Sequence, residues 1–196
     1  MKVGLFFGSF NPVHNGHLAI ADYLHKKEFF EQIWLVVTPN NPLKDKSDLI
    51  CENHRLNMVK LAIRDFPFLR ACDVEFSLPK PSYTIHTLHE LEKQYPQNEF
   101  SLILGADNLE NFHRWKKNEE ILTQYDIYVY PRNDRTLKKI IQHPHIVYFD
   151  APLLPVSATE VRRLLQQKKP VEEYLPASVV NYIKVEKLYG VFNEFF

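Results

Sequence analysis

The stretch that decides the fold spans residues 8–17 and reads Gly8-Ser9-Phe10-Asn11-Pro12-Val13-His14-Asn15-Gly16-His17. A short apolar run, Val3 to Phe7, precedes it, and a helical pattern with Asn15 as its N-cap follows at about Gly16 to Lys27. A buried strand, a turn of small residues and a helix start let the backbone approach a phosphate closely and point free N–H groups at it. Because two imidazoles stand three residues apart in the same turn, the stretch predicts a phosphate-binding turn that carries two histidines.

The length and the charge limit the kind of protein this chain can form. We expect one domain over residues 1–196, with an α/β core at 1–155 and a C-terminal helical subregion at 156–196. The 24 basic and 24 acidic side chains balance, so no global field favours nucleic acid or an anionic membrane. Cys51 and Cys72 have neither the spacing of metal ligands nor the density of a disulfide scaffold. We therefore expect a cytoplasmic protein that binds neither nucleic acid nor membranes.

Strands and helices alternate along most of the chain. Further strands are predicted at 33–37, 69–76, 100–104, 125–131 and 146–149, and further helices at 56–63, 84–95, shortly after 108 and at 137–141. This alternation predicts an α/β fold with a doubly wound, mostly parallel sheet. After Pro155 the pattern changes to two helices, at 157–167 and 178–187, which predict a C-terminal helical cap.

A second helix start at Ser157 has the pattern of a capping box. Ser157 would accept a hydrogen bond from the backbone N–H of Glu160, whose side chain would reach back to the backbone of Ser157. Arg162 follows one turn later. Ligands of doubly wound sheets bind beyond the carboxyl ends of the strands. We therefore expect the first loop, Asn40, Asp107 and the Ser157 helix start to gather at that edge.

These parts suit a polyphosphate better than they suit covalent chemistry. Phosphoryl and nucleotidyl transfer depend on holding the reactants in line and neutralising the charge that develops on oxygen. His14 and His17 could each point an N–H group at the phosphorus under attack, and loss of one such donor lowers a rate on the order of a hundredfold. The pair therefore predicts a site that positions and stabilises, without a protein nucleophile.

Other interpretations of the same residues stay open. A His-x-x-His spacing also occurs in surface or capping histidines, and Trp115 alone fits a core position. A zinc hydrolase would need a third ligand, and His54, His86 and His89 have no diagnostic spacing. A nucleotide-binding regulator without catalysis is the alternative from another class, and it would bind ATP but release no pyrophosphate.

Residues 8–17 resemble the G-x-F-x-P-x-H-x-G-H signature of adenylyltransferases and related nucleotidyltransferases. Further stretches are similar to bacterial nicotinate-nucleotide adenylyltransferases: Pro39-Asn40-Asn41, Pro81-Ser82-Tyr83-Thr84, Gly105-Ala106-Asp107 with Trp115, Tyr174-Leu175-Pro176 and Tyr182-Ile183. The resemblance implies a Rossmann-like fold and transfer of AMP from ATP to nicotinate mononucleotide, giving deamido-NAD and pyrophosphate in NAD biosynthesis. It implies Mg²⁺ on the phosphates rather than on protein ligands. A related enzyme that uses nicotinamide mononucleotide or phosphopantetheine is the nearest alternative, and a homo-oligomer stays open.

The resemblance also implies a role for each matched residue. Catalysis would depend on His14, His17 and Arg162. ATP would bind at Gly8, Ser9, Phe10, His14, His17, Lys44, Gly105, Asp107, Ser157, Thr159 and Arg162. The mononucleotide would bind at Asn40, Tyr83, Thr84, Asp107, Trp115 and Lys116, with the indole stacked on the pyridine ring. Three residues depart from the family pattern, because Asn11 and His86 stand where Asp is common and Ala158 stands where Ser is common.

Overall fold

The computed structural model describes residues 1–40, 49–131, 141–151 and 154–190. Within these ranges six strands form one sheet in the order β3-β2-β1-β4-β5-β6. Every neighbouring pair is parallel. The strands are β1 (Lys2–Gly8), β2 (Gln32–Val37), β3 (Leu69–Cys72), β4 (Glu99–Gly105), β5 (Ile127–Tyr130) and β6 (Ile146–Tyr148). This order confirms the predicted doubly wound parallel sheet.

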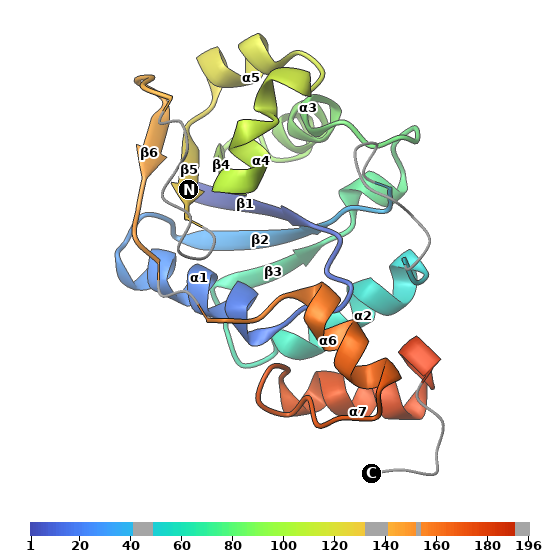
Figure 1. The fold of residues 1–196 in the computed structure, drawn as a ribbon. Coiled ribbons are helices and arrows are strands. Elements are labelled where there is room, and N and C mark those ends of the chain that lie inside the picture. The colour runs from blue at the N-terminus through green and yellow to red at the C-terminus, as the bar shows by residue number, and fades with distance from the viewer. Residues whose placement is uncertain (41–48, 132–140, 152–153, 191–196) are drawn as a thin grey trace.

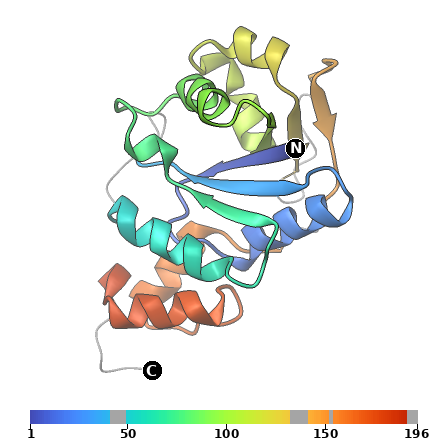
Figure 2. The same ribbon diagram turned by 180° about the vertical axis from the view of Figure 1, so that it is seen from behind.

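Helices cover both faces of the sheet (Figures 1 and 2). On one face lie α1 (Asn15–Lys26), α2 (Glu52–Ala62), α6 (Ala158–Gln166) and α7 (Ala177–Val185), and on the other lie α3 (Thr84–Gln94), α4 (Ala106–Glu110) and α5 (Asn118–Gln124). Short 3-10 turns occur at η1 (Val74–Phe76), η2 (Phe112–Arg114) and η3 (Leu188–Gly190). Because side chains of a strand alternate, Val3 and Leu5 pack into one apolar core while Phe6 packs into the other.

The first strand lies where the winding of the sheet reverses. β2 and β3 extend from one side of β1, and β4 lies on its other side. Phe6 pairs with Ile103, so the strand ends at Gly8 and Gly105 lie at the same edge. The N–H of Thr38, just after β2, donates to the carbonyl of Gly8 at 2.9 Å. Three of the predicted site loops therefore begin side by side, at the position where such sheets bind ligands.

Some local predictions need correction. The strand predicted over 69–76 ends at Cys72, because the chain turns at Asp73 and forms η1. Helix α5 was not predicted, since Ile121 is its single buried residue. Residues 137–140 of the helix predicted over 137–141 fall outside the described ranges, and Ile141 is not helical. The two predicted C-terminal helices are confirmed as α6 and α7.

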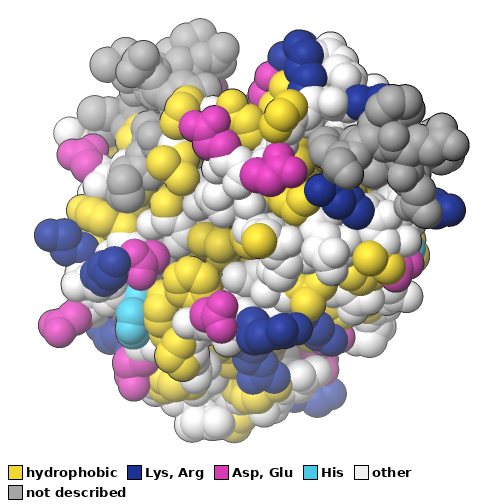
Figure 3. Space-filling view, turned by 90° about the horizontal axis from the view of Figure 1, so that it is seen from below, with side chains coloured by type: hydrophobic (Ala, Val, Ile, Leu, Met, Phe, Trp, Pro, Cys, Tyr) yellow, Lys and Arg dark blue, Asp and Glu magenta, His cyan; other side chains and the backbone are white. Residues whose placement is uncertain are grey.

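The exposed surface carries charges of both signs, in keeping with the balanced composition of the sequence. Basic and acidic side chains both occur on the face seen in Figure 3, with hydrophobic side chains between them. In the part of the chain that the structure describes, no helix has the length and apolar character needed to cross a membrane.

Candidate active site

The first turn of α1 is built by its two histidines. His14, rather than the predicted Asn15, is the N-cap of the helix, and its backbone N–H donates to Nδ1 of His17 at 3.2 Å. The Asn15 amide instead donates to the carbonyl of Glu173 at 3.0 Å. The histidine spacing therefore has a structural reason, because a residue at the third helical position can reach back to the N–H of the cap.

The two imidazoles are stacked and buried. Their ring centroids lie 3.7 Å apart with an angle of 27° between the planes, and the residues are 7% and 9% exposed. Edge contacts with Phe6 and Phe10 hold the His17 ring from the side. Since Nδ1 of His17 accepts a backbone hydrogen bond, the proton of its neutral ring resides on Nε2. His17 can therefore present Nε2–H as a donor in a fixed orientation.

Gly8 and Gly16 leave room for neighbouring rings, Gly16 for that of His14 and Gly8 for that of Phe10. A Cβ atom on Gly16 would lie 3.0 Å from both His14 Nδ1 and Val156 Cγ1, so the chain that leads into α6 packs against the start of α1. A Cβ atom on Gly8 would lie 2.9 Å from the Phe10 ring. That ring is buried in the core at 2% exposure. The predicted contact of Phe10 with ATP is therefore restricted to its backbone.

The C-terminal region closes on the same turn. Nη1 of Arg162 donates to the carbonyl of Asn11 at 3.0 Å, and the hydroxyl of Tyr189 donates to Oδ1 of Asn11 at 2.9 Å. Burial raises the pKa of Tyr189 well above its usual value, so this hydroxyl stays a donor. Arg162 thus lies beside the histidine turn, as predicted, and Tyr189 is a contact that the sequence did not reveal.

The start of α6 confirms half of the predicted capping box. Oγ of Ser157 accepts a hydrogen bond from the N–H of Glu160 at 3.2 Å. The Glu160 side chain does not reach back, because its carboxylate accepts from Arg163, at 2.9 Å from Nε. Ser157 and Thr159 are exposed. The first turn of α6 therefore presents hydroxyl groups to solvent close to the histidine turn.

Arg55 is a buried residue that joins two of the site loops. Its guanidinium donates to the carbonyls of Ser9 at 2.5 Å, Thr38 at 2.8 Å and Pro39 at 3.2 Å, and the residue is 0% exposed. Burial lowers the pKa of Arg55, and the nearby Glu52 opposes that shift. The sequence held one signal for this role, because Arg55 stands on the buried stripe of α2 together with other buried residues: Leu56, Met58, Val59 and Ala62.

The predicted acceptor residues gather at the start of α3. Tyr83 is the N-cap of this helix and Thr84 is its first residue. Nζ of Lys116 lies 4.6 Å from the centroid of the Tyr83 ring, and the His86 ring lies 5.6 Å from the same ring. Burial, followed by the positive charge of Lys116, lowers the pKa of His86. Lys116 therefore supplies positive charge beside Tyr83, while the lowered pKa favours the neutral form of His86.

The remaining predicted site residues lie on other segments of the chain. Trp115 is half-buried, with its ring 5.3 Å from Phe112, and Asn40 has a buried Oδ1 atom with no hydrogen-bond partner in the described chain. Gly105 is the N-cap of α4 and Asp107 lies exposed in the first turn of that helix. Lys44 lies outside the described residues.

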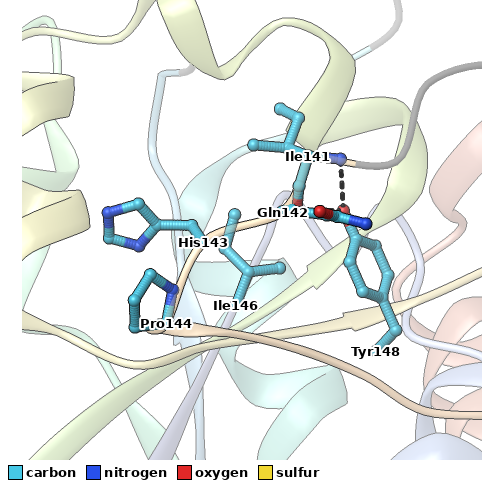
Figure 4. Close-up of a pocket in the computed structure, with 6 residues that line it drawn as sticks. All are labelled: Ile141, Gln142, His143, Pro144, Ile146 and Tyr148. Carbon is cyan, nitrogen blue, oxygen red and sulfur yellow. Dashed lines mark hydrogen bonds between the residues drawn. The ribbon is translucent and has the colours of Figure 1, made fainter.

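A pocket of about 460 Å³ lies beside β6, and its lining includes none of these residues (Figure 4). The hydroxyl of Tyr148 accepts from the N–H of Ile141 at 2.9 Å in its wall. Its lining consists of Ile141, Gln142, His143, Pro144, Ile146 and Tyr148. None of these was predicted as a site residue, so the pocket is separate from the predicted site.

Comparison with known proteins shows the family of this chain. Residues 5–164 match the family model described as cytidylyltransferase-like. A Flavobacterium johnsoniae protein named "Probable nicotinate-nucleotide adenylyltransferase" is 45% identical over 191 residues, which cover 96% of this chain and 99% of the relative. The chain belongs to the nicotinate-nucleotide adenylyltransferase family.

Two further comparisons extend this result, the first to another relative in sequence and the second to the fold alone. A Cytophaga hutchinsonii protein of the same printed name is 45% identical over 97% of this chain and 99% of the relative. The crystallised nicotinic acid mononucleotide adenylyltransferase of Plasmodium falciparum, complexed with NaAD, has a TM-score of 0.81 at 20% identity and covers 98% of this chain and 99% of that one. The second likeness shows that the chain has the fold of this adenylyltransferase.

Proposed function

We propose that this chain transfers the AMP group of ATP to nicotinate mononucleotide, forming deamido-NAD and pyrophosphate in NAD biosynthesis. Family membership supports this activity. The observation that carries the proposal is the stacked pair of His14 and His17 at the start of α1, with Arg162 of α6 donating to the Asn11 carbonyl in the turn before them. The proposed cytoplasmic location and the absence of nucleic-acid and membrane partners stay predictions.

The reaction needs donors and placement rather than a protein nucleophile. A phosphate oxygen of the mononucleotide attacks the α-phosphorus of ATP and forms the new P–O bond. The bond from that phosphorus to the oxygen that bridges to the β-phosphate breaks, and pyrophosphate leaves with the electron pair. His17 would donate from Nε2 to an α-phosphate oxygen, with His14 stacked beside it, and these donors would stabilise the charge that develops there.

The start of α6 suits the β- and γ-phosphates. Oγ of Ser157 accepts from Glu160, so its own O–H stays able to donate to a phosphate oxygen. Thr159 would add a hydroxyl and Arg162 a positive charge. The N-terminus of α6, which is the positive end of its helix dipole, would face the phosphates as well. Lys44 would assist from the loop after β2. Gly8, Ser9, Phe10 and Gly105 would line the nucleotide with backbone groups, and Asp107 would bind a ribose hydroxyl.

The residues present fit Mg²⁺ that is held by the phosphates. Mg²⁺ prefers oxygen ligands and keeps several waters. Among the described residues no group of three His, Cys, Asp or Glu side chains could hold a metal ion, and the turn offers mainly nitrogen donors and hydroxyls. When bound, Mg²⁺ would neutralise phosphate charge, while the protein orients the phosphates around it.

The acceptor would lie between the β2 loop and the start of α3. Asn40 offers a buried Oδ1 atom, Tyr83 and Thr84 begin the helix, and Trp115 would stack on the pyridine ring. Lys116 adds positive charge next to Tyr83. This charge favours an acceptor with a carboxylate, as in nicotinate, over one with a neutral amide.

One assay tests the proposal directly. The purified chain is incubated with Mg²⁺, ATP and nicotinate mononucleotide, nicotinamide mononucleotide or phosphopantetheine, and pyrophosphate release is measured together with the mass of each product. We expect the fastest release with nicotinate mononucleotide and a product with the mass of deamido-NAD. Faster release with another acceptor would reject the proposed substrate. ATP binding without pyrophosphate from any acceptor would indicate a regulator.

A further inference from the structure

Glu75 is a buried carboxyl group that the proposed reaction does not use. It lies in η1, just after β3, and is 1% exposed. The hydroxyl of Thr87 donates to its Oε1 atom at 2.7 Å. The hydroxyls of Thr38 and Ser82 lie near enough to favour the ionised carboxyl, although neither makes a hydrogen bond of good geometry, and Oε2 of Glu75 and Oγ of Ser82 are buried without one.

The three hydroxyls around Glu75 come from the segments that carry the acceptor residues. Thr38 precedes Asn40 by two residues, in the loop after β2. Ser82 directly precedes Tyr83, the N-cap of α3, and Thr87 lies in the first turns of that helix. The carboxyl group therefore lies near both segments that carry the proposed acceptor residues, and its hydrogen bond to Thr87 ties it to α3.

The groups around Glu75 indicate that its carboxyl orients nearby hydroxyls rather than forming an ion pair. Within the described part of the chain no Lys, Arg or His forms an ion pair with this carboxyl, whose pKa burial raises. A buried carboxyl held by hydroxyls contributes little to stability compared with an apolar side chain of the same size. What it does provide is direction, because the Thr87 hydroxyl turns toward Oε1 and the buried Oε2 atom is an acceptor close to Thr38 and Ser82.

We propose that Glu75 is a positioning residue for the acceptor substrate, which holds the Thr38–Asn40 segment and the Ser82–Thr84 segment at the separation that the mononucleotide requires. This inference rests on the proposed function. The ATP turn has contacts of its own at Asn11, from Arg162 and Tyr189, which come from the C-terminal region and not from the segments around Glu75. Loss of Glu75 should therefore affect the acceptor and spare ATP.

The test compares the KM values of the two substrates in variants of Glu75. Glu75→Leu removes both oxygens at similar volume, and we expect it to raise the KM for nicotinate mononucleotide about tenfold while the KM for ATP changes by less than about twofold. Glu75→Gln keeps an oxygen that can accept from Thr87, and it should restore most of the affinity. The matched control is Ser77→Ala in the same turn, whose hydroxyl donates to the Val74 carbonyl at 3.0 Å, and it should change neither KM.

A second variant covers the case in which Glu75→Leu does not fold. Ser82→Ala removes one hydroxyl near the carboxyl with little change of volume, and it should raise the same KM about threefold. Equal changes in both KM values, or a lower Tm with both KM values unchanged, would overturn the positioning role and leave the proposed function intact. A wild-type chain that makes no deamido-NAD would instead reject the proposed function, and the inference with it.

Discussion

Replacement of Gly16 by alanine should separate stability from activity. Alanine is favoured over glycine within a helix by roughly 0.5–1 kcal/mol. Its Cβ atom, however, would lie 3.0 Å from His14 Nδ1 and from Val156 Cγ1, about 0.5 Å inside an ordinary contact. The His14 ring must therefore move by about 0.5 Å, and since a displacement of about 1 Å can lower a rate about a hundredfold, we expect kcat to fall about tenfold.

The assay for Gly16→Ala joins pyrophosphate release with thermal unfolding. We expect kcat to fall while Tm stays within a few degrees of the wild-type value, because the gain in helix propensity offsets the strain. Asp22→Ala is the matched control, since it raises propensity on the same helix at a site whose ion-pair partner within the described residues is Lys26. A wild-type kcat in Gly16→Ala would refute the reasoning, because the position of the His14 ring would then not matter.

Three further predictions test other parts of the account. Tyr189→Phe should lower the free energy of unfolding by about 1 kcal/mol in denaturant titrations and raise the KM for ATP, because its hydroxyl no longer holds Asn11. Trp115→Ala should raise the KM for nicotinate mononucleotide about tenfold but leave that for ATP unchanged in steady-state assays. Burial raises the pKa of Cys72 to about 11, so its thiol stays protonated below that pH, and at about pH 8 mass spectrometry should find alkylation by iodoacetamide at the exposed Cys51 first.

The fold could be predicted because parallel strands leave a strong local signal. A strand buried on both faces is a continuous apolar run, as at β1, β2 and β4, and each of the six predicted strands overlaps a strand of the sheet. The errors fall where that signal is weak. Helix α5 is seven residues long with one buried position, Ile121, and η1 contains apolar residues that resemble the end of a strand.

The site was predictable only where its chemistry is local in the chain. His14 and His17 lie in one turn, with Gly8 before them and Gly16 between them, so the sequence showed them together. Arg55, Glu75 and Tyr189 act on residues that are remote in sequence, and Tyr189 lies 178 residues from its partner Asn11. Such contacts form only when the chain folds, so no fixed spacing in the sequence indicates them. The assigned binding roles stay predictions.

The most direct test of the central claim is the rate of adenylyl transfer in His17→Ala. Loss of this ring removes one hydrogen bond of the α1 N-cap, while Phe6 and Phe10 stay in the core, so we expect the variant to fold and bind ATP but to lose at least about a hundredfold in kcat. His25→Gln, at the far end of α1, is the control and should keep the wild-type rate. A near-wild-type kcat in His17→Ala would contradict the account, because transfer would then not depend on a donor from the histidine pair.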